Sequence, residues 1–183
     1  GASPPLLDSA RLRLRPLADS DVDEVFAIFG DPEVMRYWSF PAFRERTQAE
    51  QFMATIRQAF AARTSVLWAI ARREDDVLLG TCRLFHFESE HRRAEIGFAL
   101  RRGDWGRGLA SEAVAAVLDF AFGPLDLIRV EADVDPRNER SIRLLERLGF
   151  QREGLLRNRY IIAGEIQGTL FLGLLREEWT AHR

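Results

Sequence analysis

The chain has 183 residues, of which 46% are apolar and 30% charged, a composition that excludes a disordered chain. Twenty-six basic residues, all arginine, against 28 acidic ones give a net charge of −2, so we expect no binding to nucleic acid or to anionic membranes. No uncharged apolar stretch approaches the roughly 20 residues of a membrane span, and the single cysteine excludes an internal disulfide and favours a cytoplasmic setting.

The N-terminal third predicts one strand followed by helices. Leucine and arginine alternate over residues 10–17, which predicts a half-buried strand, and residues 1–9 before it are expected to be a flexible segment. Apolar residues at helical spacing predict a helix over residues 22–29, with Asp19 or Ser20 as its cap and Gly30 as its end. A short helical turn over residues 31–38 and a helix over residues 47–63 follow.

The rest of the chain mixes strands with two helices. Strands are predicted over residues 66–71, 77–87 and 93–100, and the short charged turns between them favour antiparallel pairing. A largely buried helix, a strand, a second helix and two strands follow, over residues 109–122, 127–134, 138–148, 150–162 and 166–175. This order predicts a single α/β domain over residues 1–183, with a mixed, mostly antiparallel sheet of about seven strands flanked by helices.

The most informative stretch is residues 94–113, AEIGFALRRGDWGRGLASEA. An apolar strand runs into a glycine-rich turn, where Gly106 and Gly108 let the backbone approach a ligand closely. The free N–H groups between Gly106 and Ser111, together with the helix dipole, form an anion site suited to a pyrophosphate. Arg102 and Arg107 flank the turn and are candidate partners for phosphate oxygens.

Two other interpretations of this turn are a plain strand–helix connection and a dinucleotide-binding loop. The spacing Gly106-x-Gly108-x-x-Ser111 is one residue from the dinucleotide fingerprint, and Glu131 is placed to bind a ribose. The turn lies after three paired strands, however, and the connection from Leu100 to Gly106 is longer than the tight turn of that fingerprint.

The same turn resembles the coenzyme A site of the GNAT superfamily of N-acetyltransferases, whose pattern is Gln/Arg-x-x-Gly-x-Gly/Ala. Gly106 and Gly108 match, and Gly103 departs from the Gln/Arg position. The stretch WGRGLASEA, residues 105–113, is similar to the branch that acetylates the N-termini of ribosomal proteins, which tolerates this departure. Residues 11–17, 138–141 with 148–150, and 174–179 resemble further segments of that branch, so the likeness spans roughly residues 10–180.

The resemblance implies acetyl-CoA as cosubstrate and a sheet splayed at its site. The implied coenzyme-binding residues are Phe98, Ala99, Leu100, Trp105, Gly106, Arg107, Gly108, Leu109, Ala110, Ser111 and Asn138.

The chemistry needs a group that accepts a proton from the amine and one that returns a proton to the thiolate. By resemblance Glu95 is the candidate base, and the alternative is a solvated glutamate beside Arg92 and Arg93. Ser141 is the candidate acid, because Leu145 stands where many family members carry a tyrosine. The alternative for Asn138 and Ser141 is helix capping, because both residue types are favoured at the start of a helix.

An aromatic cluster and a row of potential metal ligands complete the candidates. Tyr37, Trp38 and Phe40, with Phe43, lie where the family covers its acceptor cleft, although aromatic loops also serve simple packing. Strand alternation predicts one shared face for Cys82, Leu84, His86 and Glu88. Together with His91 their spacing does not match known metal clusters, so we expect no metal and expect these residues to serve in packing or in the wall of the acceptor site.

The sequence therefore predicts an enzyme that transfers acetyl from acetyl-CoA to a primary amine by direct attack in a ternary complex. The acceptor is a protein N-terminus or a small-molecule amine. The alternative is a catalytically inactive coenzyme A-binding module that acts as a sensor or scaffold. The sequence leaves the oligomeric state open, with a homodimer among the options.

Overall fold

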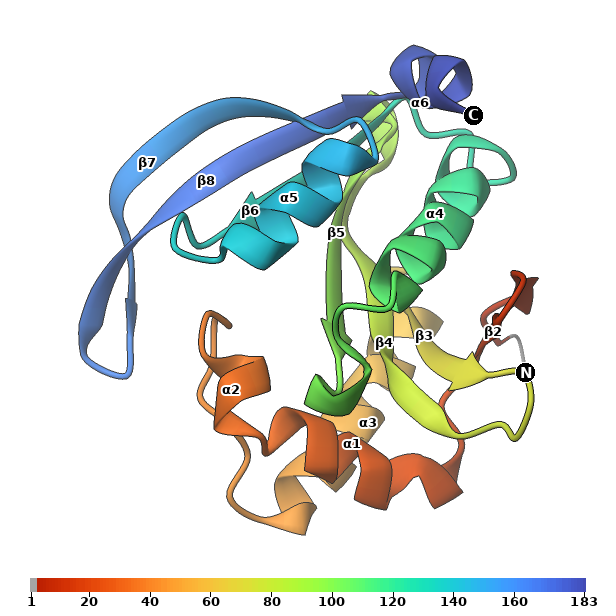
Figure 1. The fold of residues 1–183 in the computed structure, drawn as a ribbon, viewed down its shortest axis with the longest axis vertical. Coiled ribbons are helices and arrows are strands. Elements are labelled where there is room, and N and C mark those ends of the chain that lie inside the picture. Colours follow the sequence, from red (N-terminus) through yellow and green to blue (C-terminus); the bar gives the residue numbers. More distant parts are fainter. Residues whose placement is uncertain (1–2) are drawn as a thin grey trace.

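The computed structural model describes residues 3–183, and its centre is one eight-stranded sheet in the order β1-β2-β3-β4-β5-β6-β8-β7 (Figure 1). Every neighbouring pair is antiparallel except β5 and β6, which are parallel. The strands are β1 (Leu7–Asp8), β2 (Leu12–Arg15), β3 (Ser65–Arg72), β4 (Leu78–Glu88), β5 (Arg93–Leu100), β6 (Arg129–Val134), β7 (Gln151–Ile162) and β8 (Glu165–Leu175).

Helices cover both faces of this sheet. They are α1 (Val22–Phe29), α2 (Pro32–Met35), α3 (Arg46–Ala61), α4 (Leu109–Phe122), α5 (Glu139–Arg147) and α6 (Arg176–His182), with 3₁₀ turns η1 (Asp19–Asp21), η2 (Ser89–His91) and η3 (Arg102–Asp104). Strand alternation divides the core. Trp68 and Ile70 of β3 pack with α4, α5 and α6, whereas Ala69 between them packs with α1, α2 and α3.

The predicted mixed, mostly antiparallel sheet is confirmed, as is the antiparallel pairing of β3, β4 and β5. The count of about seven strands is one short, because β1 has only two residues and shows no periodicity. The helix α6 was not predicted, and neither Asp19 nor Ser20 caps α1, which follows directly on η1.

The predicted flexible segment, residues 1–9, begins with residues 1–2, which lie outside the described part of the chain. Beyond them, Leu7–Asp8 pairs with β2, and the carbonyl of Pro5 accepts a hydrogen bond from the Trp68 indole at 2.8 Å. Within residues 3–183 no helix has the length and apolar character needed to cross a membrane.

The feature that positions the site is the separation of β5 from β6. The two strands pair only through Arg93–Arg129, Ala94–Val130 and Glu95–Glu131, although β5 continues to Leu100 and β6 to Val134. Figure 1 shows β6 turning away from β5 beyond this point, while the β7–β8 hairpin, in blue, curves outward beside it. The predicted splay of the sheet is therefore present.

Candidate active site

A cleft of about 1190 Å³ opens where β5 and β6 separate. It passes between the two faces of the sheet: Glu95 and Gly97 point to the α1–α3 face, and Ile96 and Phe98 point to the α4–α5 face. Side chains from α2, α4, α5, β4 and the β7–β8 hairpin complete its wall. The cleft therefore connects the two parts of the predicted site, the glycine-rich turn and Glu95.

The glycine-rich turn has the backbone geometry of an anion site. Gly106 and Gly108 have φ of +80° and +75°, a region that glycine enters without a steric penalty. The first α-helical bond of α4 runs from the Glu112 N–H to the Gly108 carbonyl at 3.1 Å, so the N–H groups of residues 109–111 precede it and have no partner in the helix. A Cβ at Gly106 would meet nothing within 4 Å, so there is room for a diphosphate.

Trp105 fixes this turn to the end of β5. Its indole N–H donates to the Leu100 carbonyl at 2.7 Å, and the Arg140 guanidinium of α5 lies 3.8 Å above its ring. Asp104, buried beneath the turn, accepts a hydrogen bond from Arg101. These contacts connect the turn to β5 on one side and to α5 on the other.

Ten of the eleven predicted coenzyme residues line the cleft, namely Phe98, Ala99, Leu100, Trp105, Gly106, Gly108, Leu109, Ala110, Ser111 and Asn138. The structure does not bring Arg107 to it: the Arg107 side chain lies 3.6 Å from Asp104, and its carbonyl accepts a bond from Arg11. Arg102 likewise turns away and pairs with Asp31 at 3.3 Å.

Glu95 is a buried carboxylate at the point where the strands separate. Its side chain is 16% exposed, so it is not a solvated surface residue, and the His86 Nδ1 lies 3.6 Å from its Oε1. Burial raises the pKa of Glu95, an effect that the nearby imidazole of His86 opposes and the carboxylate of Asp133 reinforces. A carboxylate with a raised pKa is a better proton acceptor near neutral pH.

Asp133 was missed by sequence reasoning. It lies two residues beyond Glu131 on β6, lines the cleft, and accepts hydrogen bonds from the Tyr160 hydroxyl at 2.6 Å and from the Thr169 hydroxyl. Burial raises the pKa of Asp133, and burial together with the Asp133 carboxylate raises the pKa of Tyr160 to about 12. The signal that could have found it is the period of two that places Asp133 on the face of Glu131.

The predicted shared face of Cys82, Leu84, His86 and Glu88 is wrong beyond Leu84. Cys82 and Leu84 are fully buried in the core on the α4–α5 face, but a bulge shifts the register of β4 between Phe85 and Glu88. His86 takes a φ of +51° there and lines the cleft beside Phe85. The bulge therefore turns toward Glu95 a side chain that regular alternation would have buried.

Asn138 and Ser141 stand at the start of α5. The Asn138 side-chain oxygen accepts a hydrogen bond from the Ser141 N–H at 3.3 Å, which is a helix cap. Both residues also line the cleft, so capping and a role at the site are compatible. Leu145, at the position of the tyrosine found in many family members, is fully buried.

The aromatic residues Tyr37, Trp38 and Phe40 line the cleft, and the Arg137 guanidinium lies 5.3 Å from the centre of the Tyr37 ring. Phe40 stacks on Phe29 and Phe43 with centroid distances of 6.3 and 5.8 Å, so Phe43 supports the wall from behind. The aromatic side chains therefore pack against one another and also form part of the cleft wall.

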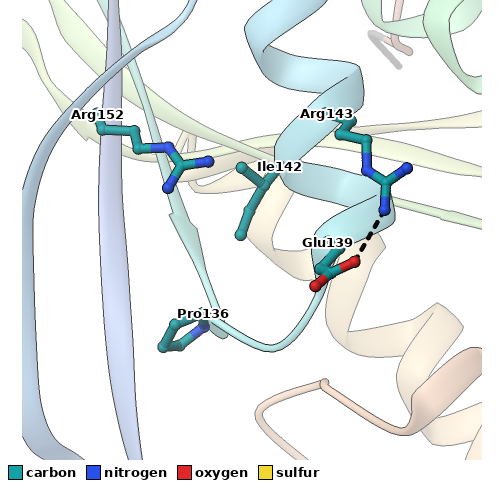
Figure 2. Close-up of a pocket in the computed structure, with 5 residues that line it drawn as sticks. All are labelled: Pro136, Glu139, Ile142, Arg143 and Arg152. Atoms are coloured by element: carbon teal, nitrogen blue, oxygen red, sulfur yellow. Dashed lines mark hydrogen bonds and ion pairs between the residues drawn. The ribbon is translucent and has the colours of Figure 1, made fainter.

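A second, shallow pocket of about 230 Å³ lies beside α5 and β7 (Figure 2). Glu139 and Arg143 form an ion pair at 2.8 Å beside it, and no carboxylate or thiol cluster faces it. In residues 3–183 no group of three or more acidic, histidine or cysteine side chains is arranged to hold a metal ion.

Comparison with known proteins identifies relatives along almost the whole chain. A family model described as an acetyltransferase (GNAT) domain matches residues 11–151. The uncharacterized N-acetyltransferase p20 of Bacillus licheniformis is 37% identical over 94% of this chain and 97% of its own length. The spermidine N(1)-acetyltransferase of Escherichia coli K12 is 26% identical, over 93% of this chain and 89% of its own.

Two further similarities concern the predicted branch and the fold. YdaF of Bacillus subtilis, named as a ribosomal N-acetyltransferase, is 30% identical over 60% of each chain. The crystal structure of a GNAT-family acetyltransferase from Bacillus anthracis has a TM-score of 0.86 and 25% identity, covering 95% of this chain and 100% of that one.

Proposed function

The chain belongs to the GNAT family of acetyltransferases, and from this premise we propose that it transfers the acetyl group of acetyl-CoA to a primary amine in a ternary complex. It is an acyltransferase by family, and the family's acyl donor is acetyl-CoA. The single observation that carries the proposal is the continuous cleft between the N–H groups at the start of α4 and the buried carboxylate of Glu95.

The backbone around Gly106 is suited to hold the diphosphate of acetyl-CoA, because its N–H groups and the dipole of α4 favour negative charge. The separated edges of β5 and β6 leave peptide groups unpaired beyond Glu95, which a pantetheine arm can use for hydrogen bonds. The thioester would then lie beside Glu95, and holding both substrates there supplies most of the rate enhancement.

In the proposed reaction Glu95 accepts a proton from the ammonium of the acceptor, directly or through a water molecule. The neutral amine forms the C–N bond at the thioester carbonyl, and the tetrahedral intermediate breaks its C–S bond. Ser141 gives a proton to the leaving thiolate, and the nitrogen gives up its second proton, which replaces the one that Ser141 donated. Direct attack fits the state of the single cysteine, because burial raises the pKa of Cys82 to about 12 and leaves it a poor nucleophile.

The acceptor is proposed to be a small-molecule amine or a protein N-terminus. A relative named for spermidine supports the first, and one named for ribosomal acetylation supports the second. We place the reaction in the cytoplasm, on the argument from cysteine content alone.

An acceptor screen tests the proposal. Purified protein is incubated with acetyl-CoA and a panel of amines that includes polyamines, amino acids and N-terminal peptides, and free thiol is measured against a no-acceptor control. Acceptor-dependent thiol release with formation of the N-acetyl product is expected. Binding of coenzyme A without turnover of any amine would favour the inactive sensor or scaffold module instead.

A further inference from the structure

The acceptor end of the cleft contains an arginine on the same face of the sheet as Glu95. Arg83 pairs with Gly97 and Phe85 pairs with Glu95 in the β4–β5 ladder, so Arg83 and Glu95 are diagonal neighbours, with Cα atoms roughly 7–8 Å apart in such a ladder. Gly97 has no side chain to cover Arg83, and a Cβ there would approach only the Phe85 ring, at 3.4 Å. The arginine therefore faces the cleft, which it lines.

Arg83 lacks the partners that a partly buried guanidinium needs. One of its terminal nitrogens donates to the Ser65 hydroxyl at 3.2 Å, and its side chain lies 5.2 Å from the centre of the Phe85 ring. Its buried Nε has no hydrogen-bond partner, and among residues 3–183 no carboxylate pairs with it. Burial lowers the pKa of Arg83. Leaving such a donor unpaired costs free energy, and no described side chain neutralises the charge of Arg83, which an anionic group in the cleft would do.

Beside Arg83 the same cleft presents acidic side chains. Glu95 and Asp133 both line it, and the partners of Asp133 are the neutral hydroxyls of Tyr160 and Thr169. Glu131, by contrast, is neutralised by Arg129 at 3.0 Å. The acceptor end of the cleft thus presents the carboxylates of Glu95 and Asp133 and, beyond Gly97 and Phe85, a guanidinium that is not paired with a carboxylate.

We propose that the acceptor of the acetyl group carries a carboxylate as well as its amine, and that Arg83 binds this carboxylate while the amine lies at Glu95. This inference rests on the proposed function and specifies its substrate class. The planar guanidinium fork matches a carboxylate in two parallel hydrogen bonds, and the buried Ser65 hydroxyl, which accepts from one terminal nitrogen, helps to fix the orientation of the fork. Polyamines lack the anion and would place a second cation near Arg83, so they are poor acceptors in this account.

The test compares acceptors that differ only in this group. Linear ω-amino acids from glycine to 6-aminohexanoate are each paired with their carboxamide, and spermidine and peptides with N-terminal Asp or Ser are run beside them. Acetyl transfer gives kcat/KM. Calorimetric titration of the same pairs into the protein with coenzyme A gives Kd without requiring turnover. A preference for the free amino acids indicates a small-molecule carboxylate, whereas a preference for the Asp peptide over the Ser peptide indicates a side-chain carboxylate at a protein N-terminus.

The variants are Arg83→Met, which keeps the length of the side chain, Arg83→Lys, which keeps the charge, and Arg57→Met as the matched control. Arg57 is an arginine of α3 outside the cleft that pairs with Asp19 at 2.7 Å. Because the Arg83 Nε has no partner, Arg83→Met should fold with a melting temperature close to that of the parent protein, which a thermal scan checks.

We expect the parent protein to prefer at least one amino carboxylate over its carboxamide about 10- to 100-fold, the range of a charge-assisted hydrogen-bond pair. Arg83→Met should lose this preference, so that the ratio between the two members of each pair falls close to one, Arg83→Lys should keep part of the preference, and Arg57→Met should keep all of it. Equal use or equal binding of the two members of every pair overturns the inference, as does spermidine as the best acceptor. If thiol is released with neutral amines but without this preference, only this inference fails, whereas no release with any amine contradicts the proposed function.

Discussion

An aspartate at Gly106 tests whether the turn before α4 holds the diphosphate of acetyl-CoA. Gly106 lines the cleft, has a φ of +80°, and leaves its Cβ direction open for 4 Å. An added carboxylate would stand beside the diphosphate, and two unit charges 4 Å apart near a protein surface repel by about 4 kcal/mol. That corresponds to a loss of affinity of roughly a thousandfold.

Two further variants separate charge from strain and from position. Gly106→Ala carries only the cost of a left-handed φ, about 1–2 kcal/mol, which lowers the melting temperature by roughly 2–8 °C in a domain of this size. Gly103→Asp adds the same charge to the same turn outside the cleft, at a glycine with open space and no positive φ.

Calorimetric titration with coenzyme A and the KM for acetyl-CoA are the assays. We expect Gly106→Asp to bind far more weakly than Gly103→Asp, and Gly106→Ala to bind with a smaller loss. Equal binding by the two aspartate variants would refute the assignment of the diphosphate to this turn.

Three other substitutions test the proposed chemistry. Glu95→Gln should lower kcat by about 10²- to 10⁴-fold, the range of a lost general base. The folded state raises the pKa of Glu95 above 4.5, so ionising Glu95 lowers the stability of the protein as the pH rises from the pKa of the unfolded state through that of the folded state. Glu95→Gln should therefore melt at a higher temperature than the parent protein at neutral pH and show no such gain at acidic pH. An unchanged rate would remove Glu95 from the mechanism. Ser141→Ala should lower kcat about a hundredfold with little change in the KM for acetyl-CoA, and the cap survives because Asn138 accepts from the backbone N–H, so a fall in melting temperature without a fall in kcat would contradict the assignment. Tyr160→Phe removes a hydrogen bond that lowers the pKa of Asp133, so the pKa of Asp133 should rise in the variant. The acidic limb of the profile of kcat/KM against pH for the acceptor should then move to higher pH. A limb that does not move would show that Asp133 does not affect acceptor use.

The sequence predicts well those parts of the site that lie within one short stretch. The glycines at 106 and 108 and the strand before them are neighbours in the chain, so their spacing alone indicates a turn that opens a helix. The alternation and turn signals of residues 66–100 were sufficient for the antiparallel pairing of β3, β4 and β5. Glu95 lies in the same stretch, and its proposed role came from the family resemblance.

The missed residues depend on contacts between distant strands. Asp133, Tyr160 and Arg83 meet the cleft through the registers of β6, β7 and β4, which no local pattern fixes. His86 was expected in packing or in the acceptor wall and does line the cleft, but it reaches the cleft through a bulge in β4, and a bulge leaves no reliable mark in one sequence. The helix α6 has seven residues, too few for a clear helical period.

A crystal structure with coenzyme A bound is the most direct test of the central claim. The account predicts that the diphosphate oxygens accept hydrogen bonds from main-chain N–H groups of residues 106–111, and that the thiol end of the coenzyme lies between β5 and β6 beside Glu95. A coenzyme bound elsewhere on the protein, or a diphosphate that makes no contact with residues 106–111, would contradict it.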